Sequence, residues 1–194
     1  QEAEVLLARP LSLLPPMEAC RHILAPLLRE LGERWHRGEI SVAVEHFGSS
    51  LIRSKLTVLL DSLRHTGKTR RVLCACPAGD LHDGGLLMFA LEAADQGWQP
   101  IYLGPDLPLP GLATAVLQSD PRLVAISIVL RRSPEELRRL FSSLYEAVAD
   151  RCPVLIGGGG TAGHEDLVLA SGCQLMPKSG KLDDLTAPSR TRRQ

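Results

Sequence analysis

Val72-Leu-Cys-Ala-Cys-Pro-Ala-Gly-Asp-Leu-His-Asp-Gly-Gly85 is the stretch that decides the fold. Its first five residues are a short apolar run that predicts a strand, and residues 84–96 predict a helix. The polar loop between them therefore leaves the carboxyl end of a strand. In open α/β sheets this is the edge at which ligands bind.

The same alternation of strand and helix continues on the C-terminal side of this stretch. Ser133 precedes Pro134 as the N-cap of one of the helices. This order predicts a doubly wound, parallel, five-stranded flavodoxin-like domain over residues 70–180. The predicted strands are 72–76, 100–103, 123–129, 154–156 and 173–176, and the predicted helices are 84–96, 109–118, 134–149 and 162–170.

Residues 1–66 have a helical period and predict a partial four-helix bundle. A first helix precedes Pro10, a second spans residues 17–35 with a possible kink at Pro26, and a third begins after Ser41 as N-cap. A bundle normally has four helices, and the chain begins with Gln1, so we expect an N-terminal truncation. Residues 65–70 are expected to be a linker, and residues 181–194 a flexible tail.

Composition excludes several classes of function. Lys and Arg together number 22, as do Asp and Glu, so this portion has no basic footprint for DNA. Its five cysteines form no CxxC pair, which favours reduced core thiols. No apolar run reaches the roughly 18 residues of a membrane span. We therefore expect a cytoplasmic protein, and the absence of a catalytic Ser-His-Asp or Cys-His set predicts that it is not an enzyme.

Three polar or glycine-rich groups lie at predicted strand ends. Asp80 and His82 are close enough for the carboxylate to fix the imidazole tautomer, while Gly84 and Gly85 let a bulky group approach. Taken alone, a loop histidine such as His82 is more often simply an exposed residue than a ligand. Ser127 ends the third strand. The run 157–160 is four glycines, which predicts either an open slot for a ligand or a flexible turn.

The spacing of these groups resembles the cobalamin-binding signature. Asp80-x-His82-x-x-Gly85 is followed after 41 residues by Ser127-x-Val129, and after 27 more by Gly157-Gly158. Val129 stands where the family often has Leu. The resemblance implies that the nucleotide base of cobalamin leaves cobalt and that His82 becomes the lower axial ligand. Asp80 would support His82, and the nucleotide tail would enter the slot beside Ser127, Gly157 and Gly158.

A second pattern narrows the resemblance. The pattern of a Trp at position 35, nine further residues and then Glu45-His46 is similar to the upper cap of CarH-type photoreceptors. This implies an adenosylcobalamin ligand with Trp35 over the adenosyl group, Glu45 bonded to it and His46 supporting the pocket. His36 would become the upper cobalt ligand after illumination. The string 102–110 is also similar, and it brings Asp106 into the expected cofactor-binding set.

The resemblance implies a light sensor that forms a homo-oligomer, a tetramer in the dark, and that contacts DNA only through a separate upstream domain. One alternative is a corrinoid carrier in methyl transfer, which has the same bundle and loop. The Trp35 and Glu45-His46 pattern suits a large adenosyl ligand better than a methyl group. A mutase subunit would need a substrate-binding barrel, and a plain flavodoxin-like domain leaves the three-part spacing unexplained.

Overall fold

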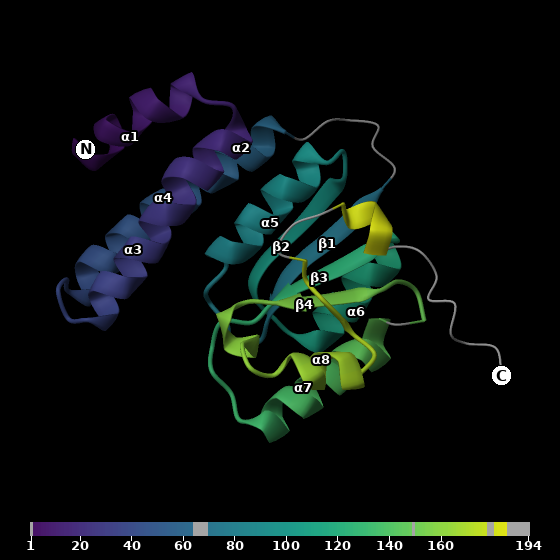
Figure 1. Cartoon of the computed structure of the whole chain (residues 1–194). Coiled ribbons are helices and arrows are strands. Elements are labelled where there is room, and N and C mark those ends of the chain that lie inside the picture. Colours follow the sequence, from purple (N-terminus) through teal and green to yellow (C-terminus); the bar gives the residue numbers. More distant parts are fainter. Residues whose placement is uncertain (1, 64–69, 149, 178–180, 186–194) are drawn as a thin grey trace.

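The computed structural model describes residues 2–63, 70–148, 150–177 and 181–185. Four N-terminal α-helices and one π-helical turn lie along one side of an α/β domain (Figure 1). The layers run from these segments to helix α5, then to the sheet, and then to helices α6, α7 and α8 on the far side (Figure 1). The predicted linker at 65–70 lies outside the described residues except for its last residue, Arg70.

The sheet has five parallel strands in the order β2-β1-β3-β4-β5. This is the flavodoxin-like order, so the predicted fold class is confirmed. The strands are β1 (Arg71–Pro77), β2 (Gln99–Leu107), β3 (Leu123–Ser127), β4 (Val154–Gly157) and β5 (Gln174–Leu175). The helices between them are α5 (Gly84–Asp95), α6 (Leu109–Ser119), α7 (Pro134–Val148) and α8 (Glu165–Ala170).

Strand β3 is shorter than the sequence predicts. It ends at Ser127, two residues before the predicted end at Val129. The backbone N–H groups of Val129 and Leu130 donate to the side chain of Asp80 instead of to a neighbouring strand. A ladder needs its N–H groups, so this competing carboxylate ends the strand.

Two other boundaries differ because of backbone conformations with positive φ. Strand β2 continues to Leu107 past the predicted end at residue 103, with irregular pairing to β1, and Gly104 and Asp106 both have positive φ within it. The last predicted helix was expected to begin at residue 162. Helix α8 begins only at Glu165, because Gly163 has a φ of 81° that no α-helix accommodates.

The helical region contains α1 (Glu2–Leu13), α2 (Pro16–Ala19), a π-helical turn (Cys20–Leu24), α3 (Ala25–His36) and α4 (Val42–Ser62). The prediction that Pro10 interrupts the first helix is wrong, because α1 runs through it. The expected second helix is continuous but changes type. In the π turn Ala25 N–H donates to the carbonyl of Cys20, five residues back, immediately before Pro26, which has no N–H to donate.

Helix α4 begins as the sequence predicts. Ser41 is its N-cap, and the Ser41 hydroxyl accepts a hydrogen bond of 3.3 Å from the backbone N–H of Val44. Its apolar stripe then buries Ile52, Leu56 and Leu60 in the same core as helix α5 and one face of the sheet. The helical region and the α/β domain therefore share one hydrophobic core, and α5 is the layer between them.

The segment after β5 corrects another expectation. Residues 181–194 were expected to be a flexible tail, but Leu182–Leu185 form a 3₁₀ turn. Leu182 is buried in the core beside α5, and its backbone N–H donates to Gln96 at 2.9 Å. Burial of one Leu side chain is enough to order a short segment. The rest of the tail lies outside the described residues.

All five cysteines are buried and have free thiols, in agreement with the expected core role. Burial raises the pKa of the Cys20 and Cys152 thiols to about 11, and that of Cys76 to about 12. These groups stay protonated and unreactive at neutral pH. Within the described residues, no helix has the length and apolar character needed to cross a bilayer.

Three of the four glycines after β4 pack closely against neighbouring segments. A Cβ atom on Gly158, which has a φ of 99°, would lie 2.2 Å from the carbonyl oxygen of Ile128. On Gly160 it would lie 2.5 Å from the carbonyl oxygen of Leu130, and on Gly157 it would meet Met176. The glycines therefore allow the β4 loop to lie directly on the backbone that follows β3.

Replacing Gly158 by Ala should therefore destabilise the fold. We expect the free energy of unfolding to fall by about 2–4 kcal/mol, from the positive φ and the backbone clash together. Gly159→Ala is the matched control, because a Cβ there meets nothing within 4 Å. Urea denaturation of both variants measures the difference, and equal losses would contradict this account of the loop.

Candidate functional site

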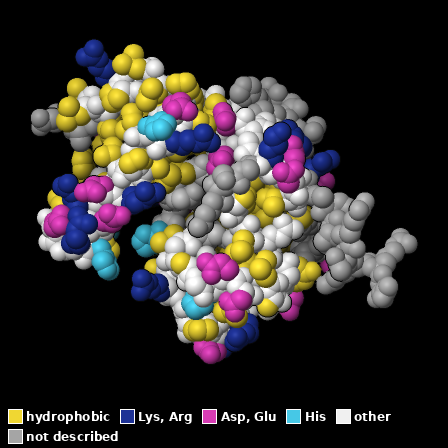
Figure 2. All heavy atoms as spheres, in the orientation of Figure 1, with side chains coloured by type: hydrophobic (Ala, Val, Ile, Leu, Met, Phe, Trp, Pro, Cys, Tyr) yellow, Lys and Arg dark blue, Asp and Glu magenta, His cyan; other side chains and the backbone are white. Residues whose placement is uncertain are grey.

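A cavity of about 710 Å³ lies between the helical region and the carboxyl edge of the sheet. The space-filling view shows the molecule hollowed between these two parts, with histidine and basic side chains beside the hollow (Figure 2). We call it the interdomain cavity. Helices α3 and α4 provide Leu28, Gly32, Glu45, His46, Ser49, Ser50 and Arg53, and the α/β domain provides Leu81, His82, Asp83, Gly84, Gly85 and Val129.

Asp80 is the fixed point below this cavity. It is 0% exposed. One carboxylate oxygen accepts hydrogen bonds from the backbone N–H groups of Val129 (2.6 Å) and Leu130 (3.0 Å). The other accepts from the backbone N–H of His82 at 3.3 Å. Asp80 therefore ties the β1 loop to the segment that follows β3.

His82 projects from this loop into the interdomain cavity, with 62% of its side chain exposed. Its Nδ1 lies 3.6 Å from an Asp80 carboxylate oxygen, just beyond hydrogen-bond range. The carboxylate is thus on the Nδ1 side of the ring, as the sequence predicts for a partner that fixes the tautomer. This arrangement leaves Nε2 as the nitrogen to bind a ligand.

Asp106 lies at the end of β2 and supports the loop from below. Its carboxylate accepts a 2.7 Å hydrogen bond from the backbone N–H of Gly79, and its own N–H donates to the carbonyl of Asp80 at 3.1 Å. Its φ of 56° is unusual for a residue other than glycine. In the described chain Asp106 contacts the loop and lies outside the wall of the interdomain cavity.

The opposite wall of the cavity carries the predicted pair Glu45-His46. His46 Nδ1 lies 2.7 Å from a Glu45 carboxylate oxygen, and Glu45 is the more buried of the two. Glu45, Ser49 and Arg53 are spaced four residues apart, so they lie along one face of α4 above His82.

Trp35 and His36 lie in the last turn of α3. Trp35 is 49% exposed and lies outside the cavity wall among the described residues. It follows Gly32 by three residues and Leu28 by seven, and both of these line the cavity, so the helical period places Trp35 on the same face of α3. The structure brings it to the rim of the cavity and not into it.

Ser127, Gly157 and Gly158 form a separate group. Ser127 is buried and pairs with Gly157 across β3 and β4. These residues also lie outside the wall of the interdomain cavity in the described chain. Met176 occupies the space beside Gly157. The twelve predicted site residues are therefore divided between the cavity, its rim, the supporting loop and this inner group.

Sequence reasoning missed a charged network at the base of the cavity. Asp83 is 1% exposed, and its carboxylate accepts hydrogen bonds from Arg53 Nη2 (2.8 Å) and from the Tyr102 hydroxyl (2.6 Å). Arg53 Nε lies 2.6 Å from the other oxygen. Burial and the bond to Asp83 raise the pKa of Tyr102. The signal available in the sequence was Arg53 within the apolar stripe of the predicted helix, together with Asp83 next to His82.

The residues around His82 suit a bulky metal complex. A neutral imidazole nitrogen is a good ligand for cobalt, whereas a carboxylate cluster would suit a hard cation. A Cβ atom on Gly85 would meet nothing within 4 Å. On Gly84 it would lie 2.5 Å from Leu28, so this glycine lets the Leu28 side chain of α3 pack closely against the start of α5. No side chain from these two residues stands between His82 and the cavity, so the chemistry and the shape fit cobalamin.

Comparisons with known proteins agree with this fit. Two family models described as B12 binding domains match residues 1–60 and 70–176. The structure of a Methanosarcina barkeri monomethylamine corrinoid protein has the same fold, with a TM-score of 0.71 and 18% sequence identity. It covers 90% of this chain and 84% of that protein.

Two transcriptional repressors of Myxococcus xanthus are also similar. The HTH-type repressor CarA is 39% identical over 166 residues, which are 84% of this chain and 54% of that protein. The HTH-type repressor CarH is 36% identical over 155 residues, covering 80% and 52%. The chain spans about half the length of these relatives. The family inferred from the Asp80-x-His82 spacing is confirmed: the chain belongs to the B12-binding domain family and is similar to the cobalamin-binding portion of CarH-type regulators.

Proposed function

We propose that this chain is the light-sensing module of a transcriptional regulator that binds adenosylcobalamin in the interdomain cavity. The observation that carries the proposal is the position of His82, directly below a cavity whose opposite wall is helical and carries Glu45. The similarity to two HTH-type repressors favours regulation over catalysis. DNA binding would belong to another part of the full-length protein.

The lower side of the site would hold the cofactor through His82. Asp80 is fixed by three backbone N–H groups, so its position is set before any ligand binds. It would accept a hydrogen bond from the Nδ1–H group of His82 and make Nε2 a better electron-pair donor to cobalt. Ser127, Gly157 and Gly158 would contact the nucleotide tail. Because Met176 lies against Gly157, this part of the site would require the Met176 side chain to move.

The upper side of the site would respond to light. When bound, adenosylcobalamin supplies a cobalt–carbon bond that visible light cleaves. Before cleavage Glu45 would hydrogen-bond the adenosyl group, His46 would support Glu45, and Trp35 would close over the group from the rim. Without these contacts the α3–α4 hairpin is free to shift, and His36 at the end of α3 would reach the vacated upper position.

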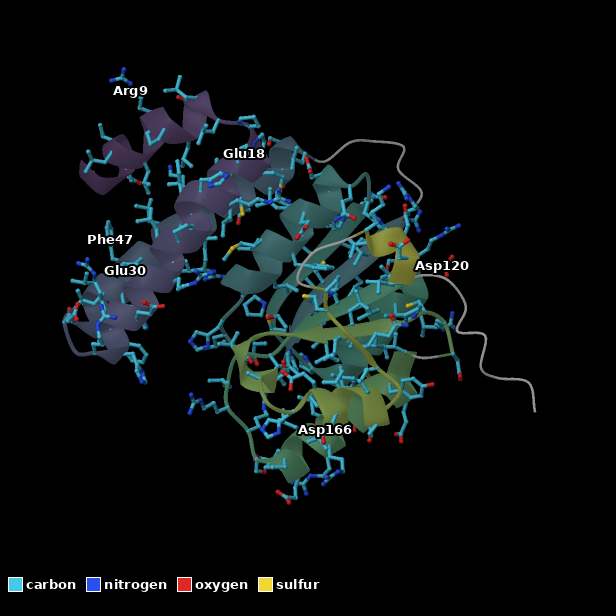
Figure 3. All side chains as sticks on the ribbon, viewed as in Figure 1. Arg9, Glu18, Glu30, Phe47, Asp120 and Asp166 are labelled. Carbon is cyan, nitrogen blue, oxygen red and sulfur yellow. The ribbon has the colours of Figure 1, made fainter. Side chains whose placement is uncertain are left out.

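An exposed apolar face supports assembly of several copies in the dark. Val44, Phe47 and Val58 of α4 are all more than half exposed, as are Val5 and Leu6 of α1. Phe47 points away from the α/β domain (Figure 3). Apolar side chains on neighbouring helices, on the side away from the cavity, are suited to contact with a second copy of the chain.

A corrinoid carrier in methyl transfer is the second candidate. The monomethylamine corrinoid protein shares the fold, and a fold alone does not distinguish the two functions. The distinction rests on the upper wall. A methyl group is too small to touch Glu45 and Trp35 together, so a carrier would bind cobalamin without a change of assembly on illumination.

Size-exclusion chromatography with adenosylcobalamin tests the proposal. We expect the chain to elute as an oligomer in the dark and as a smaller species after green light, with a spectrum of cobalt bound by two histidines. Cobalamin binding without a light-dependent change of size would replace the proposal by the carrier function. No binding of cobalamin would reject both.

His82→Ala should remove the lower ligand while leaving the fold intact, because the side chain is mostly exposed. Absorbance spectra should change from the histidine-bound to the unligated form, and the affinity for cobalamin should fall by about tenfold or more, as expected for loss of one metal ligand. His164→Ala is the control, since this half-buried side chain stands at the N-cap of α8 without a capping hydrogen bond and lies outside the wall of the interdomain cavity. A wild-type spectrum from His82→Ala would show that another group binds cobalt.

Trp35→Ala should weaken the dark oligomer and leave the lower-ligand spectrum unchanged. The physical reason is that Trp35 lies in the last turn of α3, outside the wall of the interdomain cavity among the described residues, whereas His82 lies within that wall. Leu117→Ala on α6, with a comparable exposure of 56%, is the control. If Trp35→Ala lost both the lower-ligand spectrum and the oligomer, a role confined to the upper side of the site would be contradicted. If the oligomer were unchanged, Trp35 would have no role in assembly.

A further inference from the structure

His82 lies between two buried carboxylates that are anchored to different parts of the molecule. Asp80 and Asp83 are 0% and 1% exposed. Asp80 is held by backbone N–H groups of the segment that follows β3, within the α/β domain. Asp83 is held by Arg53, which belongs to α4 of the helical region. The short loop that carries His82 is thus attached at one end to the sheet and at the other to the helical region.

The second attachment involves both oxygens of a carboxylate that is itself buried. Arg53 contacts both carboxylate oxygens of Asp83, at 2.8 Å through Nη2 and 2.6 Å through Nε. Tyr102 of β2 donates to the same carboxylate from the other side, so the carboxylate has a fixed place at the start of α5. A buried carboxylate that loses its cation is strongly destabilised. If α4 moves, Asp83 must therefore follow Arg53 or rearrange.

Helix α4 connects this attachment to the upper wall of the interdomain cavity. Glu45 and Arg53 are eight residues apart on one face, which is about 12 Å along a rigid helix. A displacement of α4 at Glu45 is transmitted to Arg53 without any flexible segment between them. The Arg53 side chain is 44% exposed and Asp83 is 1% exposed, so a displacement of Arg53 acts on a carboxylate that the protein encloses.

We propose that Arg53 is a positioning residue that couples the place of the helical region to the geometry of His82 through Asp83. The coupling works in both directions, since it is a property of the equilibrium between two arrangements. A shift of the upper wall would change the conformation of the His82 loop. Ligation of His82 would in turn favour one position of α4 relative to the sheet. The cobalt part of this inference rests on the proposed function, but the mechanical part concerns the chain alone.

A second ion pair between the two parts provides the matched control. Arg21 lies in the π turn and reaches Glu92 of α5 at 3.7 Å, with side-chain exposures of 54% and 33%. It also joins the helical region to the α/β domain, but its partner Glu92 lies in the C-terminal half of α5, ten residues after His82. A general effect of docking would appear in both Arg21→Met and Arg53→Met. A specific effect on His82 would appear only in Arg53→Met.

The first experiment measures amide hydrogen exchange of the full chain without ligand. Peptides covering residues 78–91 include the N–H of His82, bonded to Asp80, and that of Leu87, bonded to the carbonyl of Asp83. We expect Arg53→Met to accelerate exchange there by about tenfold, as the loop opens more often. Arg53→Lys keeps the cation and should restore part of the protection. Arg53→Met combined with Asp83→Asn removes both charges and should restore more.

The second experiment measures the spectrum of each variant with adenosylcobalamin in the dark, as pH is lowered until the lower histidine dissociates. A purely structural role would leave this titration unchanged. We expect Arg53→Met to dissociate at a higher pH than wild type, because the loop no longer holds His82 in place. Arg21→Met should titrate like wild type, and Arg53→Lys should lie between.

Three outcomes would overturn the inference. These are unchanged exchange in Arg53→Met, equal changes in Arg53→Met and Arg21→Met, or accelerated exchange with a wild-type His82 titration. If the wild-type chain binds no cobalamin, the proposed function fails, and the exchange experiment still decides whether Arg53 holds the loop.

Discussion

The buried carboxylate of Asp80 is the interaction on which the rest of the site depends. It satisfies the backbone N–H groups of Val129 and Leu130, and in doing so it ends β3 at Ser127. It also accepts a hydrogen bond from the backbone N–H group of His82 within its own loop. A buried charge of this kind is tolerated only with such a set of donors. One side chain therefore sets the end of a strand and the path of the next loop, and it lies on the Nδ1 side of the imidazole.

The other features of the carboxyl edge follow from the closeness of these loops. Asp106 takes a positive φ so that its side chain can bond the backbone of Gly79. Gly158 and Gly160 have no room for a side chain, because the segment after β3, held by Asp80, lies against them. The helical region then completes the site from above. It packs on α5 through a shared apolar core and places the polar face of α4 opposite His82.

Much of the fold was predictable because its signals are local. The apolar runs predicted all five strands, and Ser41 and Ser133 predicted two helix starts that the structure confirms through their hydroxyl–backbone bonds. The family followed from the spacing of Asp80, His82, Ser127 and Gly157, which is a property of the sequence itself. The place of His82 beside Asp80 followed from their closeness in one loop.

What could not be predicted depends on contacts between distant segments. The strand end at Ser127 results from a carboxylate about fifty residues away, and the docking of Leu182 from a core that the local sequence does not reveal. The close packing of Gly158 and Gly160 on the backbone after β3 was not predicted, because a sequence does not show which backbone a glycine faces. The pair Arg53 and Asp83 was missed for the same reason, since thirty residues separate its members.

The identity of the lower cobalt ligand is the central claim, and electron paramagnetic resonance tests it most directly. The protein would be produced in cells supplied with ¹⁵N-labelled histidine. It would then be loaded with cobalamin in the cobalt(II) state. If His82 is the axial ligand, each cobalt line is split into a doublet by the labelled nitrogen, and His82→Ala abolishes the doublet. A triplet from the unlabelled nitrogen of the cofactor's own base would contradict the account, because it would show that the base had never left the metal.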